Sequence, residues 1–363
     1  MISFKIFDTI DDQLIYEIIK IKLDSFSYVF QMPEWINTLI AFEDNQIKLK
    51  LIFVYSNSEV ILIAPLCIKN KYGYKELSWL TSDIIDYNGI IISKTFDFTD
   101  KFFISSWQKI IKILSSECDI IFFNKIPEFI ETSFNPILDN HYKFYQNSYQ
   151  LNLDNFNYNY FYNKKNNSKA QQTDRRKQKK LNEGNDLSCT HLAINSANMK
   201  LVEILVFEKI SFYKKKKQKI FFYNYLVGAY KNLIKFSANN FTFNISILKK
   251  NNKKISSILG VIFNNRYYYL IPFVHNTEYK KFSPGRLHII KLIDWANKNK
   301  IRLIDFTAGD ENYKSNWSNF NFKMYYYIKL VNLSGLFRFI FLNLYFRLRK
   351  NFFLKKIYQL TQI

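Results

Sequence analysis

The residues best suited to chemistry gather in one segment of the C-terminal half, Tyr267–Trp317. Within it, Ser283, Pro284 and Gly285 stand directly before a stretch with helical apolar spacing. The first turn of a helix exposes backbone N–H groups and a positive dipole end, and this combination binds phosphate. Gly285 lets a ligand approach the backbone closely, and Pro284 fixes φ for the helix start. An ordinary capped helix would carry the same residues, so the motif predicts an anion site only together with its neighbours.

The second feature is a polar cluster that follows a buried strand. Asp305 lies near the end of the apolar run RLIDF, and a short polar stretch comes next. Catalytic groups collect on such loops because a rigid scaffold positions them. The alternative is a purely structural role, in which Asp305 caps a helix or forms a salt bridge. The cluster comprises Gly309, Asp310, Glu311, Tyr313 and Lys314.

Composition sets broad limits on the function. The chain has 363 residues, 48% of them hydrophobic, which suits two domains or one large one. Its net charge of +22 would suit nucleic acid, an anionic membrane or an acidic substrate. Lys, Asn, Ile, Phe and Tyr are abundant together, however, as AT-rich codon usage alone produces. Arg is much rarer than Lys, which weakens a nucleic-acid interpretation, and no DNA partner is expected.

Cysteine spacing and the chain termini bear on metals and location. Cys67, Cys118 and Cys189 are far apart and odd in number, so neither a disulfide framework nor a metal site is expected. The N-terminus lacks the long apolar region of a signal peptide, and no spanning segment is present. We therefore expect a cytoplasmic protein.

The C-terminal tail is basic and apolar. Between Leu336 and Tyr358 the chain mixes Phe, Leu and Ile with several Arg and Lys residues. A helix of this composition can lie on an anionic membrane, which would place the protein at its inner face. The alternative is that the tail packs back onto the preceding module.

The elements that position these residues can be read from periodicity. Phe241–Leu248, Ile255–Phe263 and Arg266–Val274 are predicted strands separated by NNKK and NNR turns. A predicted helix over Arg286–Asn299 and a buried strand over Arg302–Phe306 follow. Upstream, the polar and basic stretch Tyr160–Leu181 is predicted to be helical.

The first half repeats this plan. A hairpin is predicted over Lys48–Tyr55 and Val60–Ile68, and a helix over Phe102–Ser115 precedes a strand over Asp119–Phe123. The sequence thus predicts an α/β (α+β) fold with two related modules. Each would have a mixed, mostly antiparallel sheet flanked by helices.

Several motifs named above, together with others along the chain, resemble those of the GNAT-type acetyltransferases of the CelD-like group. This group is named after a protein of cellulose biosynthesis and is related to the FemAB-like peptidyl transferases. The matching motifs run from about residue 25 to 320, and their order and spacing are more specific than any one of them. In the C-terminal half they are Ser283-Pro284-Gly285, Leu292–Ala296, Ile304-Asp305-Phe306, Gly309-Asp310, Tyr313-Lys314 and Trp317. Upstream they are Phe30–Trp35, Ile63–Leu66, Asp86–Gly89, the basic helix Asp174–Leu181, and Leu259-Gly260-Val261 with Tyr267–Pro272.

The resemblance implies two tandem GNAT-like modules, at residues 1–148 and 149–331, with a basic amphipathic C-terminal helix at 332–363. It also implies that the second module binds acetyl-CoA or a longer acyl-CoA. The CoA pyrophosphate would lie on the amides of Ser283, Gly285, Arg286 and Leu287, and Phe273 and Val274 would contact the pantetheine arm. The chain lacks the full Q/R-x-x-G-x-G/A loop of standard GNAT enzymes, and only Gly285 stands there.

The implied chemistry is direct attack of an acceptor amine on the thioester, which requires a proton acceptor. Asp305, Glu311 and His275 are the candidate bases, and Tyr313 could protonate the leaving thiolate. The acceptor would be a sugar, a peptide or a cell-envelope or polysaccharide precursor. Two alternatives stay open: an aminoacyl transferase that uses charged tRNA, and a non-catalytic scaffold in polysaccharide synthesis. The predicted substrate-binding residues are Arg175, Arg176, Asp310 and Lys314.

Overall fold

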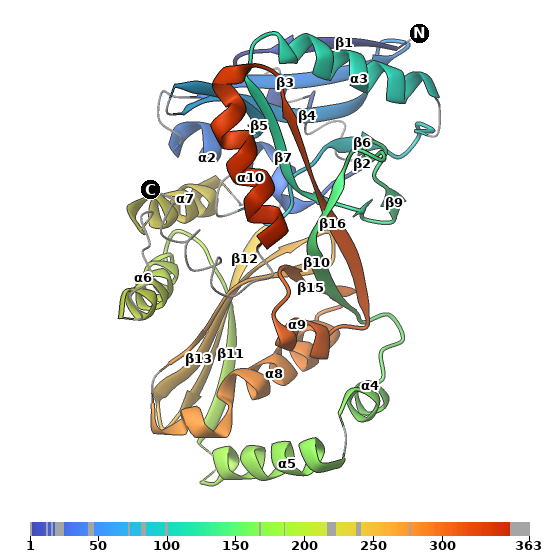
Figure 1. Cartoon of the computed structure of the whole chain (residues 1–363). Coiled ribbons are helices and arrows are strands. Elements are labelled where there is room, and N and C mark those ends of the chain that lie inside the picture. The colour runs from blue at the N-terminus through green and yellow to red at the C-terminus, as the bar shows by residue number, and fades with distance from the viewer. Residues whose placement is uncertain are drawn as a thin grey trace. The chain divides into compact units, whose positions relative to one another are not determined.

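The computed structural model describes residues 2–11, 14–15, 17–18, 25–42, 47–71, 73–80, 85–98, 101–166, 168–184, 186–215, 223–236, 241–275 and 277–348. The chain forms two compact units (Figure 1). Unit 1 comprises Met1–Asn147 and Phe322–Ile363, and unit 2 comprises Ser148–Asn321.

Unit 1 is built on a mixed sheet with strand order β1-β3-β4-β5-β7-β16. All neighbours in this order are antiparallel except β5 and β7, which pair in parallel at Glu76↔Ile120 and Leu77↔Ile121. The strands are β1 Ile2–Phe7, β2 Ser25–Phe26, β3 Ile47–Ser56, β4 Glu59–Lys71, β5 Tyr74–Trp79, β6 Ile91–Ser93, β7 Ile120–Pro127, β8 Phe129–Ile130, β9 Ser133–Phe134 and β16 Phe320–Leu330. The helices are η1 Val29–Gln31, α2 Pro33–Phe42, α3 Lys101–Ser115, η3 Leu333–Gly335 and α10 Leu336–Leu348.

Unit 2 follows the same plan, with strand order β10-β15-β14-β13-β12-β11 and one parallel pair, β14 with β15. The boundary between the units falls within β10, whose last residues pair with β15. The strands are β10 Lys143–Asn152, β11 Leu187–Ala193, β12 Thr242–Lys250, β13 Lys253–Phe263, β14 Arg266–Val274 and β15 Leu303–Ala308. The helices are α4 Tyr158–Lys165, α5 Ser168–Asn182, α6 Lys200–Lys215, α7 Tyr223–Phe236, η2 Glu278–Phe282, α8 Pro284–Lys298 and α9 Asn312–Asn316.

The predicted fold class is confirmed. In each unit three antiparallel strands lead through a helix, α3 or α8, to a strand that pairs in parallel with the third. The division of the chain differs from the expected segments 1–148, 149–331 and 332–363. Because β16 pairs antiparallel with β7, from Met324↔Pro127 to Leu330↔Ile120, residues 322–330 belong to unit 1. Helix α10 packs on β7 and β16 of that same unit, through Leu342 against Phe122 and Tyr326.

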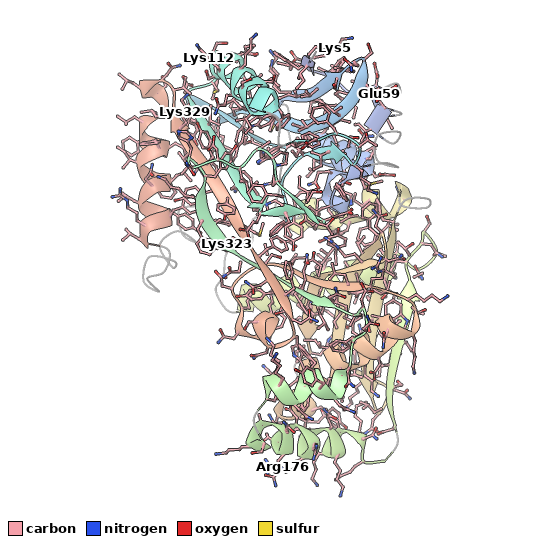
Figure 2. All side chains as sticks on the ribbon, turned by 90° about the vertical axis from the view of Figure 1, so that its right-hand side faces the viewer. Lys5, Glu59, Lys112, Arg176, Lys323 and Lys329 are labelled. Carbon is pink, nitrogen blue, oxygen red and sulfur yellow. The ribbon has the colours of Figure 1, made fainter. Side chains whose placement is uncertain are left out.

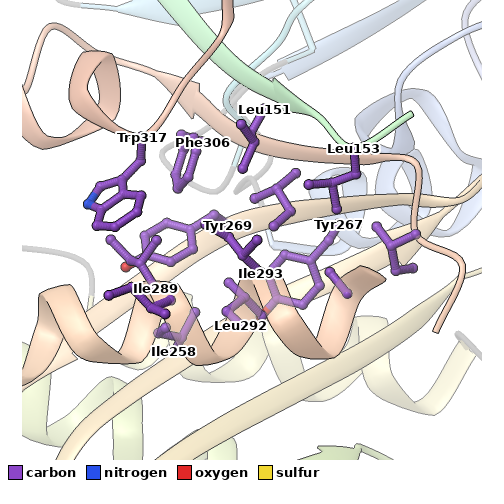
Figure 3. Close-up of a cluster of buried hydrophobic side chains, with 14 of the residues drawn as sticks. Leu151, Leu153, Ile258, Tyr267, Tyr269, Ile289, Leu292, Ile293, Phe306 and Trp317 are labelled. Carbon is purple, nitrogen blue, oxygen red and sulfur yellow. The ribbon is translucent and has the colours of Figure 1, made fainter. Parts of the chain in front are cut away.

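A large apolar core anchors the elements of unit 2 that carry the polar cluster. Helix α8 packs on one face of the sheet through Ile289, Leu292 and Ile293, while α6 and α7 lie on the other face (Figure 1). Tyr267 and Tyr269 of β14 meet α8 in this core (Figure 3). Burial of so many large side chains holds β14, α8 and β15 together. The same core includes Phe306 and Trp317.

Candidate functional site

The site is built on the parallel strands β14 and β15, which pair over three residues and then part. The register runs from Arg266↔Leu303 to Tyr268↔Asp305, while β14 continues to Val274 in partnership with β13. A β-bulge lies at the point of parting, because Leu259 faces Ile271 and Gly260 faces Tyr269. The extra residue on β14 bends that strand. Within the described residues, the edge of β14 beyond Tyr268 is therefore not covered by β15.

The start of helix α8 packs beside the end of β14, although η2 lies between them in the sequence. A Cβ atom on Gly285 would lie 2.9 Å from Cγ2 of Val274, so glycine permits close packing of the helix start on the strand. Ser283 adopts a left-handed backbone with φ of 57°, and its carbonyl accepts from the amides of Arg286 and Leu287 at 3.0 and 3.5 Å. Leu287 itself is buried in an apolar cluster. Of the four amides predicted to hold the pyrophosphate, those of Arg286 and Leu287 thus already bond to Ser283, and that of Ser283 bonds to the carbonyl of Lys280 at 3.1 Å. The amide of Gly285 remains of the predicted set, and Gly285 also serves helix packing.

Lys177 on α5 reaches the start of α8 with its ammonium group. Its Nζ donates to Oγ of Ser283 at 2.9 Å. Lys177 belongs to the basic helix predicted from the sequence, but it is not among the predicted site residues. The helical spacing of α5 does not by itself indicate which of its many cations faces Ser283.

Arg286 is engaged with α4 and α5. Its Nε donates to Oδ2 of Asp174 at 2.5 Å, and a terminal nitrogen donates to Oδ1 of Asn166 at 2.6 Å. The guanidinium also lies 4.9 Å from the ring centroid of Trp317. These contacts tie α8 to the basic helix. A pyrophosphate role for Arg286 would require the ion pair with Asp174 to be shared or broken.

Asp305, the first candidate base, is enclosed in the sheet with 0% exposure. Its Oδ2 accepts from Nε2 of Gln150 at 3.0 Å and lies 3.5 Å from a guanidinium nitrogen of Arg266. Its Oδ1 accepts from the amide of Thr307 at 2.8 Å. Since both oxygens are engaged by the surrounding strands, this carboxylate is placed to order the end of β15 rather than to meet a substrate.

Glu311 and Lys314 form an ion pair just beyond the end of β15. Oε2 of Glu311 lies 3.2 Å from Nζ of Lys314, and the carboxylate side chain is 58% exposed while the lysine is 6% exposed. Lys314 also donates to the carbonyl of Ala308 at 2.6 Å. Gly309 has φ of 135°, and a Cβ atom there would lie 2.2 Å from Oε2 of Glu311. The glycine therefore makes room for the pair.

Lys209 of α6 is the group that sequence reasoning missed. Its Nζ donates to the backbone carbonyl of Pro272 at 2.5 Å, on the part of β14 that has left β15. Burial lowers the pKa of Lys209 to about 8, an effect that nearby Glu311 opposes and nearby Lys314 reinforces. Two lysines and one carboxylate thus interact where the strands have parted. No local motif marks Lys209 among the many lysines of the chain.

Tyr313 and His275 occupy different surroundings. Tyr313 is half-buried, with its ring centroid 6.3 Å from that of Tyr269. His275 shares a hydrogen bond of 2.9 Å with Ser257, and its Nδ1 lies 3.8 Å from a carboxylate oxygen of Glu208. Burial lowers the pKa of His275, against the opposing charge of Glu208. His275 is therefore held by β13 and α6, and the structure gives it no contact with the Glu311–Lys314 pair among the described residues.

The other predicted binding residues lie at the surface or in packing positions. Arg175 and Arg176 are exposed on α5, and Figure 2 shows Arg176 at the outer side of that helix. Asp310 is exposed beside Glu311. Phe273 packs edge-to-face with Phe212 of α6, with ring centroids 5.8 Å apart. Roles of these residues in binding stay predictions.

Comparison with known proteins agrees with this architecture. Residues 168–315 match the family described as "Acetyltransferase (GNAT) domain". Among curated proteins, no sequence matches the chain. Solved structures share the fold at low identity, and the likeness therefore concerns the fold alone.

Three of these structures span nearly the whole chain. FemX superimposes with a TM-score of 0.58 at 12% identity, covering 90% of this chain and 97% of its own. A tandem GNAT protein from the clavulanic acid biosynthesis pathway gives 0.50 at 8%, covering 92% and 99%. The C-terminal domain of a putative lysylphosphatidylglycerol synthetase from Agrobacterium fabrum gives 0.51 at 8%, covering 91% and 95%. The tandem arrangement of two GNAT-like modules therefore has counterparts among known folds.

Proposed function

We propose, from the acetyltransferase (GNAT) domain that residues 168–315 form, that this acyltransferase takes its acyl group from acetyl-CoA or a longer acyl-CoA. The acceptor that we propose is the amine of a sugar, a peptide or a cell-envelope or polysaccharide precursor. The observation that carries the proposal is the parting of β14 from β15 at a β-bulge, with the start of α8 packed against Val274 at the end of β14. An extended thioester arm can use the edge of a strand as a hydrogen-bonding partner, while a helix start receives the phosphates at the arm's other end.

The donor would be held by main-chain and cationic groups. The pantetheine arm would lie along β14 between Tyr269 and Val274, and the pyrophosphate would lie at the start of α8 by Ser283 and Gly285. Lys177 supports this placement because its Nζ already lies 2.9 Å from Ser283. An ammonium beside a helix start adds charge-assisted hydrogen bonds to the dipole attraction.

The chemistry that we propose uses groups at the end of β15. The acceptor nitrogen attacks the thioester carbonyl, a C–N bond forms, and the C–S bond breaks. The amine proton passes to Glu311, directly or through water, because this carboxylate is exposed while Asp305 is enclosed. Lys209 and Lys314 would stabilise negative charge on the carbonyl oxygen. Tyr313 would donate a proton to the departing thiolate.

Donor binding is tested by thermal unfolding of the purified chain with acetyl-CoA, CoA or ADP. A ligand that binds only the folded state raises stability by mass action, by about 2.7 kcal/mol at a hundred times its Kd. We expect both CoA compounds to raise the Tm more than ADP, and Lys177→Met to reduce the shift with each ligand, because all three carry a diphosphate. No shift with acetyl-CoA or with longer acyl-CoA esters would refute the acyl-CoA proposal.

A second candidate is aminoacyl transfer from charged tRNA. The observation that favours it is the exposed cationic face of α5, formed by Arg175, Arg176, Lys179 and Lys180. Binding through phosphates depends steeply on salt. Tight tRNA binding with a steep salt dependence, together with loss on changing Arg175 and Arg176 to Gln, would favour this candidate over acyl-CoA.

A further inference from the structure

The outer face of helix α10 is apolar and exposed along its whole length. Phe337 is 90% exposed, and Ile340, Leu344 and Leu348 follow it at spacings of three and four residues. Residues at these spacings share one face of a helix. We call these four side chains the outer stripe. Soluble proteins rarely leave such a continuous apolar strip uncovered, so the stripe indicates a binding surface.

The inner face of the same helix is already in use. Leu342 is buried against Phe122 and Tyr326, and Phe346 stacks on Tyr326 with ring centroids 3.9 Å apart. Arg338 is bonded to the buried Glu76 through Nε at 3.0 Å. Helix α10 is therefore fixed to unit 1, and the outer stripe is a lasting feature of its surface.

Charge identifies the chemistry of the partner. From Asn312 to Ile363 the chain has nine lysines and arginines and no acidic residue. Arg347, three residues after Leu344, is exposed on the same side of α10. An apolar stripe with an exposed arginine on the same side, in a segment without acidic residues, matches the interface of an anionic lipid bilayer.

We propose that the outer stripe of α10 binds the surface of an anionic membrane, with the helix lying in the plane of the interface. The 13 described residues of α10 span about 20 Å at 1.5 Å per residue, whereas a bilayer core is about 30 Å thick. No helix within the described residues is long and apolar enough to cross a bilayer. A second copy of the chain fits the stripe less well, because pairing two such faces would bring cationic surfaces together.

The test is co-sedimentation of the full chain with vesicles of phosphatidylcholine, alone or mixed with phosphatidylglycerol. We expect binding to the mixed vesicles that weakens with salt, and little binding to the neutral ones. Changing Phe337 and Leu344 together to Ser should weaken binding at least about tenfold, because their apolar surface no longer enters the interface. Phe134→Ser is the matched control, since Phe134 is an exposed aromatic residue elsewhere in unit 1.

Further measurements decide the remaining outcomes. Arg347→Gln should weaken binding to the mixed vesicles and reduce the salt dependence of that binding. This variant and the Phe337/Leu344 variant should keep the wild-type Tm, because they change exposed side chains. Equal binding to neutral vesicles, or unchanged binding of the Phe337/Leu344 variant, would overturn the proposal. Lipid-free self-association in ultracentrifugation that this variant abolishes would also overturn it and assign the stripe to a second copy. Acyl transfer in solution is independent of all these results.

Discussion

Nζ of Lys209 lies 2.5 Å from the backbone carbonyl of Pro272, which places a lysine of α6 on the part of β14 that has separated from β15. This contact brings the half-buried ammonium of Lys209 into the electrostatic range of Glu311 and Lys314. Burial and the nearby charge of Lys314 both disfavour the protonated form of Lys209, and the lowered pKa of Lys209 measures this loss of free energy. The contact therefore links the stability of unit 2 to pH and to the candidate site.

Replacement of Lys209 by Met should change how stability depends on pH. Burial lowers the pKa of Lys209 to about 8 in the fold, against 10.5 in the unfolded chain. Between these values the unfolded state binds more protons, so the wild-type free energy of unfolding should rise with pH relative to the variant, by up to about 3 kcal/mol. Urea titrations from pH 7 to 10.5 measure this difference. Lys200→Met, on the exposed side of the same helix, is the control. Parallel curves for wild type and Lys209→Met would contradict a lowered pKa of Lys209 in the fold.

Glu311→Gln tests the proposed base. The amide keeps the size of the side chain but accepts no proton, so kcat should fall by about 10²- to 10⁴-fold, while the Tm should change little because the side chain is exposed. Acyl transfer to an amine acceptor, followed by release of free thiol, measures this change. Asp154→Asn is the control, since that exposed carboxylate pairs with Arg302 at the other end of β15. If Glu311→Gln retains full activity, Glu311 is not the base.

Gly309→Ala should reduce activity by displacing the Glu311–Lys314 pair. The new Cβ atom would lie 2.2 Å from Oε2 of Glu311 and 2.8 Å from Nζ of Lys314. The backbone φ of 135° adds strain, typically about 1 to 3 kcal/mol. Gly184→Ala is a matched control, because Gly184 also has a positive φ, of 86°, but its Cβ would come no closer than 3.6 Å to a neighbour. Comparable loss of stability in both variants, with loss of activity in Gly309→Ala alone, is the expected result.

The strands of unit 2 could be predicted because their local signals agree. The predicted strands that end at Leu248 and Phe263 and the strand Arg266–Val274 are confirmed within two residues at each end. Asn251, Asn252, Asn264 and Asn265 all adopt positive φ, which tight hairpin turns require and asparagine tolerates. The predicted helix after Ser283 and the predicted strand that contains Asp305 are also confirmed. In both cases the apolar spacing agrees with residues at the ends that favour the start or end of that element.

Features that depend on distant partners could not be predicted. The stretch Tyr160–Leu181 is two helices, because Asn166 leaves the helical conformation and bonds to the carbonyl of Tyr162 through both its backbone and its side chain. The assignment of β16 to unit 1 follows from pairing with a strand about 200 residues earlier in the sequence. The contact of Lys209 with Pro272 likewise spans 63 positions. The spacing of apolar residues predicts whether a segment is a helix or a strand, but it does not show which distant segment packs against it.

Lys177→Met should weaken donor binding without slowing the chemical step. Lys177 lies at the proposed pyrophosphate position, far along the donor from the reacting thioester, so its loss removes uniform binding. We expect KM for acyl-CoA to rise about tenfold, the effect of about 1.4 kcal/mol, with kcat nearly unchanged. Lys179→Met, an exposed lysine of the same helix, should leave both constants unchanged. A fall in kcat with unchanged KM would place Lys177 in the chemistry instead.

His288 should make unit 2 sensitive to acid. It is buried on α8 between Oγ of Ser246, 2.7 Å from Nε2, and Oγ of Ser256, 2.8 Å from Nδ1, and burial lowers its pKa to about 3. Below pH 6.5 the unfolded chain takes up a proton that the folded chain does not, so stability falls as the pH drops from about 6.5 towards 3, by up to about 5 kcal/mol. His288→Gln lacks this titration, and its loss of stability across the same window should be smaller by that amount. Urea titrations at pH 7, 5.5 and 4 measure the difference, and His141→Gln, at an exposed histidine, should match the wild type. Identical acid sensitivity in His288→Gln and wild type would show that His288 is protonated in the fold, which the two serine contacts and its burial argue against.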